Sequence, residues 1–306
     1  MSFHAIDRTI LSIMERTATV GRRQLSHLAG VSPMTVSRAV DRLLRAGILT
    51  ELHERDSVGG RQGRILTLRP DSPLLWLDLS RPHTSITALL VDSLLRPLCR
   101  LERLYSPLHS DEDHLRLLLN DLCRHPVAAR YLATTNRPWG IAATPLSDGP
   151  DSLAPLRGVI DEYLPMHHLT VVSTEEAIRG ACLHAAPLNC PRLLVIHTDG
   201  VPHAATWRIE RTAHGEVHAL SEDESVLSDT LARYLQDGAS DAVACFVQDY
   251  RRFHAPTPTV WVGNTRTRDG MDIEDTVALL SDDALSRGSL LIARRALWAD
   301  VMEHNR

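Results

Sequence analysis

The residues best suited to chemistry are arginines on a short segment near the N-terminus. Arg38, Arg42 and Arg45 recur at spacings of four and three residues, so a helix would place them on one side. A guanidinium group makes two-point contacts with phosphate and with the edge of guanine. Shorter side chains that could reach base edges lie just before or among these arginines: Ser32, Pro33, Met34, Thr35 and Ser37. The pattern indicates contact with nucleic acid.

A helix over residues 32–46 must position these side chains. Ser32 suits the N-cap, and Pro33 suits the first helical position, where its missing N–H costs nothing. Gly47 is a suitable stop. The apolar residues recur at helical spacing and form an inward stripe, which consists of Val36, Val40, Leu43 and Leu44.

Two shorter helices are expected before this one, the first ending before Gly21 and the second ending at Gly30. Two short strands are expected after it, at 48–53 and 65–69. The segment 55–64 between them is rich in glycine and arginine, as at an exposed hairpin tip. Three helices followed by such a hairpin predict a winged helix-turn-helix over residues 1–70.

This arrangement predicts double-stranded DNA as the partner. The third helix would enter the major groove, and the hairpin would place Arg61, Gln62 and Arg64 along phosphates or in a minor groove. Eleven arginines and six acids give residues 1–70 a net charge of +5, against −5 for the whole chain, so the rest carries −10. A small helical docking or dimerisation domain with solvated arginines is the alternative. The cap, turn glycine and basic hairpin together favour DNA.

Residues 74–306 form a second predicted domain, joined through a linker at 71–73. Strands and helices alternate there, which is typical of an α/β fold, and no internal repeat is evident. The expected strands are 74–79, 85–91, 139–143, 169–173, 192–197, 203–209 and 258–262. The expected helices are 111–124, 153–163, 174–186, 225–236, 240–252, 273–280 and 284–303.

The chain resembles the ROK family of repressors and sugar kinases along nearly its whole length. Gly30–Arg38 looks like the family's turn and recognition helix, and Gly59–Leu68 looks like its wing. Fainter matches follow in the family's order, at Leu77–Thr84, Ile86–Asp92, Gly140–Pro145, Val171–Gly180, Val195–Gly200, Val260–Asn264 and the terminal helix with Gly288, Ala293 and Ala296. The resemblance implies two actin-like lobes around a cleft, a homodimer, a repressor role and a sugar-like effector.

The departures from the family's kinase pattern predict a protein without kinase activity. The first phosphate loop lacks its glycines, and Pro82 offers no N–H to a phosphate. Thr174 falls at the catalytic base position, where a hydroxyl cannot take a proton as a carboxylate can. The family's zinc motif is absent from the sequence, so no metal and no other cofactor is expected.

The effector candidates within the resemblance are Thr174, Glu175, Glu216 and His218. Two other hypotheses about the function of the protein stay open. The protein could be a bifunctional kinase that uses Glu175 or Glu176 as its base, or a regulator whose body docks a protein partner in place of a small ligand.

Composition sets the remaining bounds. The chain has 306 residues, 43% of them hydrophobic, without a bilayer-spanning apolar run or a leader pattern. Five cysteines without a CxxC pair argue against a disulfide framework. A cytoplasmic protein without membrane contact is expected.

Overall fold

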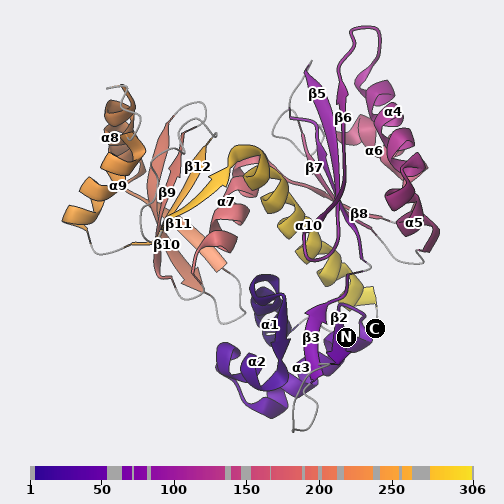
Figure 1. Cartoon of the computed structure of the whole chain (residues 1–306), viewed down its shortest axis with the longest axis horizontal. Coiled ribbons are helices and arrows are strands. Elements are labelled where there is room, and N and C mark those ends of the chain that lie inside the picture. The colour runs from indigo at the N-terminus through magenta and orange to yellow at the C-terminus, as the bar shows by residue number, and fades with distance from the viewer. Residues whose placement is uncertain are drawn as a thin grey trace. The chain divides into compact units, whose positions relative to one another are not determined.

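A computed structural model of the chain describes residues 4–53, 64–70, 72–80, 84–134, 139–145, 153–165, 167–187, 190–198, 202–211, 217–236, 242–254, 257–263 and 276–304. The chain divides into two compact units (Figure 1). Unit 1 comprises Met1–Thr174 and Ser289–Arg306, and unit 2 comprises Glu175–Gly288.

Unit 1 begins with a winged helix-turn-helix, as the sequence predicts. Its small antiparallel sheet has the strand order β1-β3-β2. The elements are α1 (Ala5–Thr17), β1 (Thr19–Gly21), α2 (Arg22–Ala29), α3 (Pro33–Arg45), β2 (Leu49–His53) and β3 (Arg64–Leu68).

Helix α3 begins and ends where the sequence predicts. The hydroxyl of Ser32 accepts a hydrogen bond from the backbone N–H of Thr35 at 3.2 Å, and Pro33 is the first helical residue. Gly47 follows the helix with a φ of 71°, in the left-handed region that favours glycine. The buried face carries Val36, Ala39, Val40 and Leu43.

The rest of unit 1 contains a mixed five-stranded sheet with the order β6-β5-β4-β7-β8. Strands β4, β5 and β6 pair antiparallel, whereas β4, β7 and β8 pair parallel. The elements are β4 (Leu74–Asp78), β5 (Ser85–Val91), β6 (Pro97–Leu104), α4 (Asp111–Arg124), α5 (Pro126–Thr134), β7 (Trp139–Thr144), α6 (Ala154–Tyr163) and β8 (His167–Val171).

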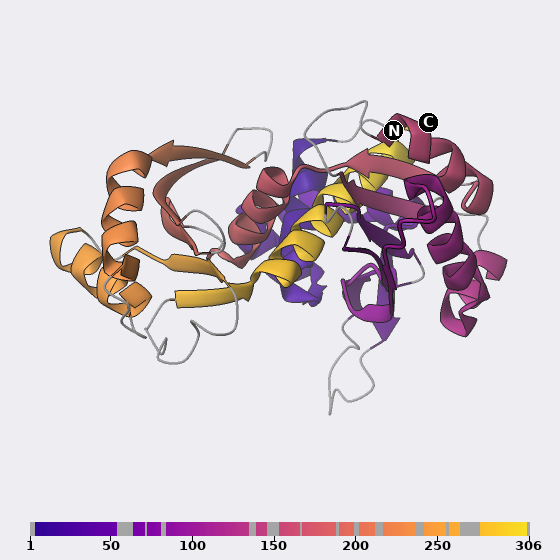
Figure 2. The same cartoon turned by 90° about the horizontal axis from the view of Figure 1, so that it is seen from above.

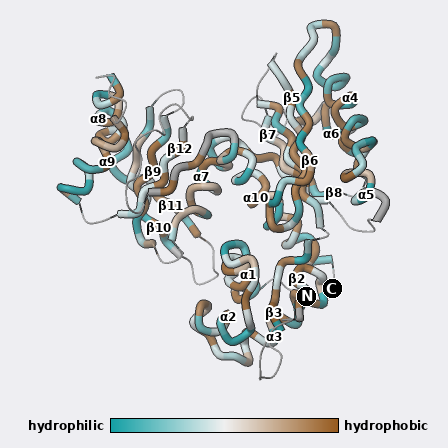
Figure 3. The backbone as a smooth tube through the Cα atoms, viewed as in Figure 1, coloured by the Kyte–Doolittle hydropathy of each residue, from teal (hydrophilic) through white to brown (hydrophobic). Residues whose placement is uncertain are grey.

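Unit 2 contains a second five-stranded sheet, with the order β11-β10-β9-β12-β13. The elements are α7 (Thr174–Ala185, whose first residue falls in unit 1), β9 (Arg192–His197), β10 (His203–Arg211), β11 (Val217–Glu222), α8 (Glu224–Gln236), α9 (Ala242–Phe253), β12 (Thr259–Gly263) and β13 (Thr276–Leu280). Strands β5 and β9 consist largely of buried hydrophobic residues, as the hydropathy colouring of the backbone shows (Figure 3).

The two large sheets repeat one topology, although the sequence shows no internal repeat. In each sheet the first three strands form an antiparallel meander, and the fourth and fifth add parallel to the first. Each sheet also carries an indole-to-threonine hydrogen bond, from Trp76 to Thr144 at 3.0 Å and from Trp261 to Thr198 at 3.1 Å. The repeat is structural, because no sequence period accompanies it.

Most predicted body elements are confirmed, but the helix predicted at 273–280 is wrong. Residues 276–280 form strand β13, which pairs parallel with β12. The segment is rich in apolar residues and too short for its period to separate a helix from a strand, so the neighbouring strand decides. Strands β6 and β11 and helix α5 were not predicted.

The last helix, α10 (Ser281–His304), contributes residues to both units; it is the long yellow helix in Figure 2. Within unit 1, Trp298 and Met302 belong to the same hydrophobic core as Ile10 and Met14 of α1. In unit 2, a Cβ at Gly288 would lie 1.6 Å from the carbonyl oxygen of Ala177, so only glycine fits there.

A buried ion pair joins α10 to α1 inside unit 1. The carboxylate of Glu15 lies 3.0 Å from Nη2 of Arg294 and 2.6 Å from Nη2 of Arg295. The Glu15 and Arg294 side chains are only 1% and 2% exposed. Arg294 also donates to the carbonyl of Ser93, whose hydroxyl donates to the carbonyl of Arg69. The ion pairs of Arg294 and Arg295 with Glu15 therefore attach α10 to the winged helix-turn-helix.

Candidate nucleic-acid interface

The outward face of α3 carries four of the ten residues predicted to contact DNA. Pro33, Met34, Thr35 and Arg38 are exposed, and the Met34 side chain is 66% exposed. Arg38 has no hydrogen-bond or ion-pair partner among the described residues. An exposed cation without an internal partner is free to bind an external anion, because it need not break a bond first.

Ser32 and Ser37 have internal tasks. The Ser32 hydroxyl caps α3 and lies 2.9 Å from the hydroxyl of Thr35. Ser37 is half-buried and accepts a hydrogen bond from Nη1 of Arg22 at 3.1 Å. Both residues therefore contribute to the placement of α3, whatever contact they make with DNA.

Arg42 does not share the exposed face of Arg38, although the sequence places both arginines on one side of the helix; its predicted contact with DNA stays a prediction. Its guanidinium turns to Asp7 of α1, with Nη2 at 2.6 Å from Oδ1 and Nε at 3.4 Å from Oδ2. The Asp7 side chain is fully buried, and that of Arg42 is 18% exposed. A buried carboxylate is costly unless it is paired with a cation. Asp7 on α1 lies within reach of Arg42 on α3, which supplies that cation. Arg42 thus holds the two helices together.

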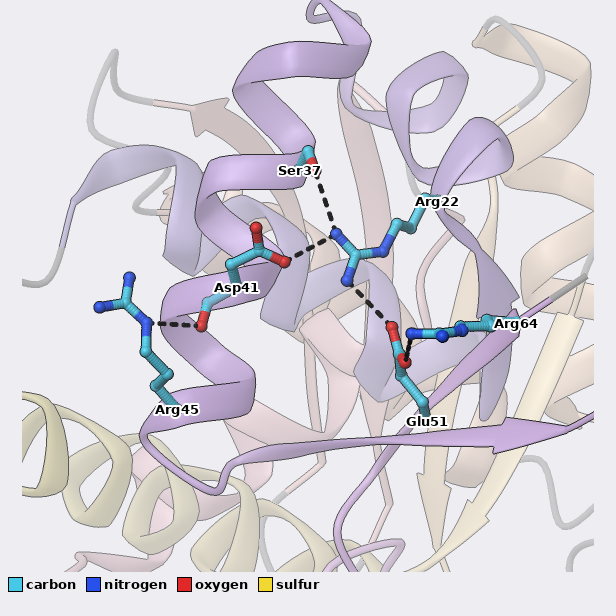
Figure 4. A network of polar contacts seen from close by, with 6 residues as sticks. All are labelled: Arg22, Ser37, Asp41, Arg45, Glu51 and Arg64. Atoms are coloured by element: carbon cyan, nitrogen blue, oxygen red, sulfur yellow. Dashed lines mark hydrogen bonds and ion pairs between the residues drawn. The ribbon is translucent and has the colours of Figure 1, made fainter.

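Arg22, at the start of α2, is the centre of the polar network in Figure 4. Its guanidinium donates to Ser37 and to Asp41 of α3, at 3.1 and 2.8 Å. It also donates to Glu51 of β2 at 2.9 Å. The planar, forked guanidinium makes all three bonds at once, so a single side chain positions α3 against the wing.

The network shifts the pKa values of its members. Partial burial by itself lowers the pKa of Arg22, but the hydrogen bonds with Glu51 and Asp41 outweigh burial and raise it. The hydrogen bond from Arg22 lowers the pKa of Glu51; burial opposes this effect, and the bond from Arg64 adds to it. Glu51 is therefore charged at neutral pH and holds both arginines.

The wing is described only at its base. Arg64 begins β3, is 66% exposed, and lies 2.9 Å from Glu51. Arg61 and Gln62 lie outside the described residues. The predicted contribution of the hairpin tip therefore stays a prediction.

Sequence reasoning missed Arg22 and Arg23. No spacing rule connects Arg22 with partners 15, 19 and 29 residues away, so only the fold reveals its role. Arg23 is exposed on the first turn of α2 and, like Arg38, has no side-chain partner within the described part of the chain. Arg45 is exposed, and its Nε donates to the carbonyl of Asp41 at 3.2 Å.

The described effector candidates lie on two elements, helix α7 and strand β11. Thr174 and Glu175 begin α7, and Glu175 pairs with Arg179 one turn later. His218 is exposed on β11, opposite Glu210 of β10. Glu216 lies outside the described residues. Asp78, at the end of β4, is buried, and one carboxylate oxygen accepts from the N–H and the hydroxyl of Ser80, at 3.0 and 2.6 Å.

Metal and membrane sites were also sought. Within the described ranges, no three histidine, cysteine or acidic residues are grouped so that they could hold a metal ion. No helix in those ranges is long and apolar enough to span a membrane.

Comparison with known proteins agrees with the winged helix-turn-helix. Residues 3–50 match the family model for winged helix-turn-helix DNA-binding segments. A search of curated proteins finds no significant match to the chain.

The whole chain shares its fold with a solved ROK family transcriptional regulator, described as a homologue of the E. coli MLC protein. The TM-score is 0.51 at 12% identity, over 98% of this chain and 97% of that one. The glucomannokinase of Arthrobacter sp. strain KM (TM-score 0.41, 15% identity, 74% and 98% coverage) and the ROK hexokinase of Thermus thermophilus (TM-score 0.41, 15% identity, 72% and 97% coverage) match less well. The predicted fold, a winged helix-turn-helix followed by an α/β body, is confirmed.

Proposed function

We propose that this protein is a transcription regulator of the ROK type that binds double-stranded DNA through α3 and the wing. The observation that carries the proposal is the pair of exposed cations Arg23 and Arg38, which have no side-chain partner among the described residues, together with exposed Met34 and Thr35. All four residues lie in the segment 3–50, which matches a family of winged helix-turn-helix DNA-binding proteins. The regulator that shares the fold supports the same role for the body.

The mechanism follows from the geometry of α3. With α3 in the major groove, Met34, Thr35 and Arg38 reach base edges, while Arg23 at the start of α2 contacts a phosphate. A homodimer presents two copies of α3 to half-sites about 34 Å apart, so the operator is a palindrome. The DNA-binding domain comprises residues 1–70, and the body, 74–306, pairs the copies and senses an effector. A sugar-like effector at the predicted body residues stays a prediction.

The body is proposed to lack kinase activity. Thr174 at the predicted base position offers a hydroxyl, and the neighbouring Glu175 is engaged with Arg179. Asp78, beside the predicted phosphate loop, is occupied by Ser80. Incubation with ATP and a panel of hexoses and amino sugars tests this. We expect no sugar phosphate, and turnover that is abolished by Glu175→Gln or Glu176→Gln would contradict the proposal.

The DNA-binding test is selection from a random double-stranded library with the full chain, followed by footprinting of the selected site. We expect a palindromic site whose affinity falls steeply with salt. Arg23→Ala should reduce the slope of log affinity against log salt by about 1 and weaken all sequences alike. Arg100→Ala, at an exposed arginine on β6, is the matched control and should change neither. Failure to enrich any sequence would contradict the proposal.

A further inference from the structure

A pocket of about 530 Å³ lies within unit 1, between the end of α3 and the last turns of α10. Its volume falls in the range of about 300–1,000 Å³ typical of small-molecule sites. One wall is formed by the last α3 residues and the turn that follows, including Leu44, Arg45 and Ile48. The opposite wall is formed by α10, including Trp298 and His304. The function proposed above does not use this pocket.

The polar lining of the pocket carries an excess of positive charge. Arg45 and Arg69 contribute guanidinium groups, and His304 contributes an imidazole. Among the described lining residues one is acidic, Asp300, whose Oδ1 lies 3.0 Å from Nδ1 of His304 and pairs with it when the imidazole is protonated. Because two arginines face one aspartate, the described lining is net positive whether or not His304 is protonated, which favours an anionic ligand.

The rest of the lining is largely apolar. Leu44, Ile48, Leu297, Trp298 and Val301 surround the space. Trp298 is 5% exposed and lies beneath the guanidinium of Arg294, 5.0 Å from the ring centroid. A ligand with an apolar body as well as an acidic group suits this lining, because a fully polar molecule would bury its polar atoms against these apolar side chains without hydrogen bonds.

The pocket is braced before any ligand binds. The Ser93 hydroxyl holds the backbone of Arg69, and Arg294 holds the backbone of Ser93. Arg294 is itself fixed by the buried carboxylate of Glu15. Bracing of this kind lowers the entropy cost of binding.

We propose that this pocket binds a small organic carboxylate with an apolar body, and that the ligand regulates DNA binding. The regulatory part rests on the function proposed above. The ligand contacts the last turn of α3, the helix proposed to bind DNA. If it changes the DNA affinity, DNA changes the affinity for the ligand by the same factor. The binding part stands by itself, because it needs no DNA.

Calorimetry of the full chain without DNA tests the site, with octanoate as the probe and glucose 6-phosphate as a polar anion for comparison. We expect saturable octanoate binding and none of the sugar phosphate. Arg69→Gln removes a charge and should weaken octanoate at least tenfold. Val301→Trp should fill the space and abolish binding. Arg100→Gln, outside the pocket, should leave binding unchanged.

Several results would overturn the site. These are an octanoate Kd above about 10 mM, binding that Arg69→Gln leaves intact, or stronger binding of glucose 6-phosphate than of octanoate. Thermal melts show whether Val301→Trp folds. If that variant does not fold, the octanoate affinity of Arg69→Gln still tests the site. DNA titration with and without saturating octanoate tests regulation separately. Unchanged DNA affinity would overturn regulation alone, and absence of DNA binding would overturn the proposed function while leaving the site intact.

Discussion

Two exposed arginines of the winged helix and two carboxylates of the α/β body differ in whether they have partners. In the winged helix, Arg23 and Arg38 are exposed and have no partner in the described structure. In the body, two carboxylates beside the predicted kinase positions are engaged, Asp78 with Ser80 and Glu175 with Arg179. A group that already has a partner must lose it before it can act on a ligand. The difference is what we expect if the winged helix carries the proposed DNA-binding activity.

The same contrast exists inside α3. Arg38 and Arg42 lie one helical turn apart, but Arg38 is exposed whereas Arg42 is bound to the buried Asp7. Identical residue types at helical spacing therefore have different tasks. The partner on the neighbouring helix decides which arginine stabilises the fold and which remains available.

The largest effect is expected at the buried ion pair, where charge serves stability alone. Glu15→Gln leaves the buried Arg294 without its counter-charge and should lower the free energy of unfolding by about 3 kcal/mol. Urea unfolding followed by circular dichroism measures it. Asp121→Asn is the control, because it breaks an exposed pair with Arg103 and should cost less than about 1 kcal/mol. Equal losses in both variants would break the distinction between buried and exposed charge.

A smaller effect is expected at Arg22, which positions α3 without contacting DNA. Arg22→Met removes the bonds to Ser37, Asp41 and Glu51, so DNA affinity should fall about tenfold. The pKa of Glu51 should also rise toward its ordinary value, because the bond from Arg22 is the largest cause of its shift. Carboxyl NMR titration measures that pKa. Arg22→Lys keeps the charge without the fork, so it should restore only part of both effects. An unshifted Glu51 pKa in Arg22→Met would contradict the positioning role.

The smallest effect concerns acid stability. The pKa of Glu51 is lower in the folded chain than its ordinary value of 4.5, so its stabilisation is complete above that pH. It is lost as the pH falls through the folded value. Native protein should therefore exceed Glu51→Gln in Tm at pH 7, and the gap should shrink by about pH 3.5. Thermal melts at the two pH values measure this. A gap that is independent of pH would mean that the charge of Glu51 contributes nothing.

The sequence predicted the winged helix-turn-helix well because its signals are local. The cap at Ser32, the stop at Gly47 and the apolar stripe of α3 depend on neighbours within a few residues. The exposure of Met34, Thr35 and Arg38 follows from the same helical period.

The rest depends on contacts that spacing cannot reveal. Arg42 shows the right period for the outward face, yet Asp7, 35 residues earlier, pairs with it. Strand β13 has an apolar pattern that also suits a helix, and pairing with β12 decides its state. The repeated sheet topology leaves no sequence period, because many apolar sequences fit the same strand order.

The central claim is that Arg38 acts on DNA while Arg42 acts on the fold. The most direct measurement is fluorescence anisotropy of the selected operator with Arg38→Ala and Arg42→Ala, alongside the unfolding free energy of each variant. Arg38→Ala should lose about 1–3 kcal/mol of DNA binding and keep its stability. Arg42→Ala should lose stability because Asp7 stays buried without a cation, and should bind DNA as the native protein does at temperatures where it is folded. Full DNA affinity in Arg38→Ala, or a loss of affinity in folded Arg42→Ala as large as that expected for Arg38→Ala, would contradict the account.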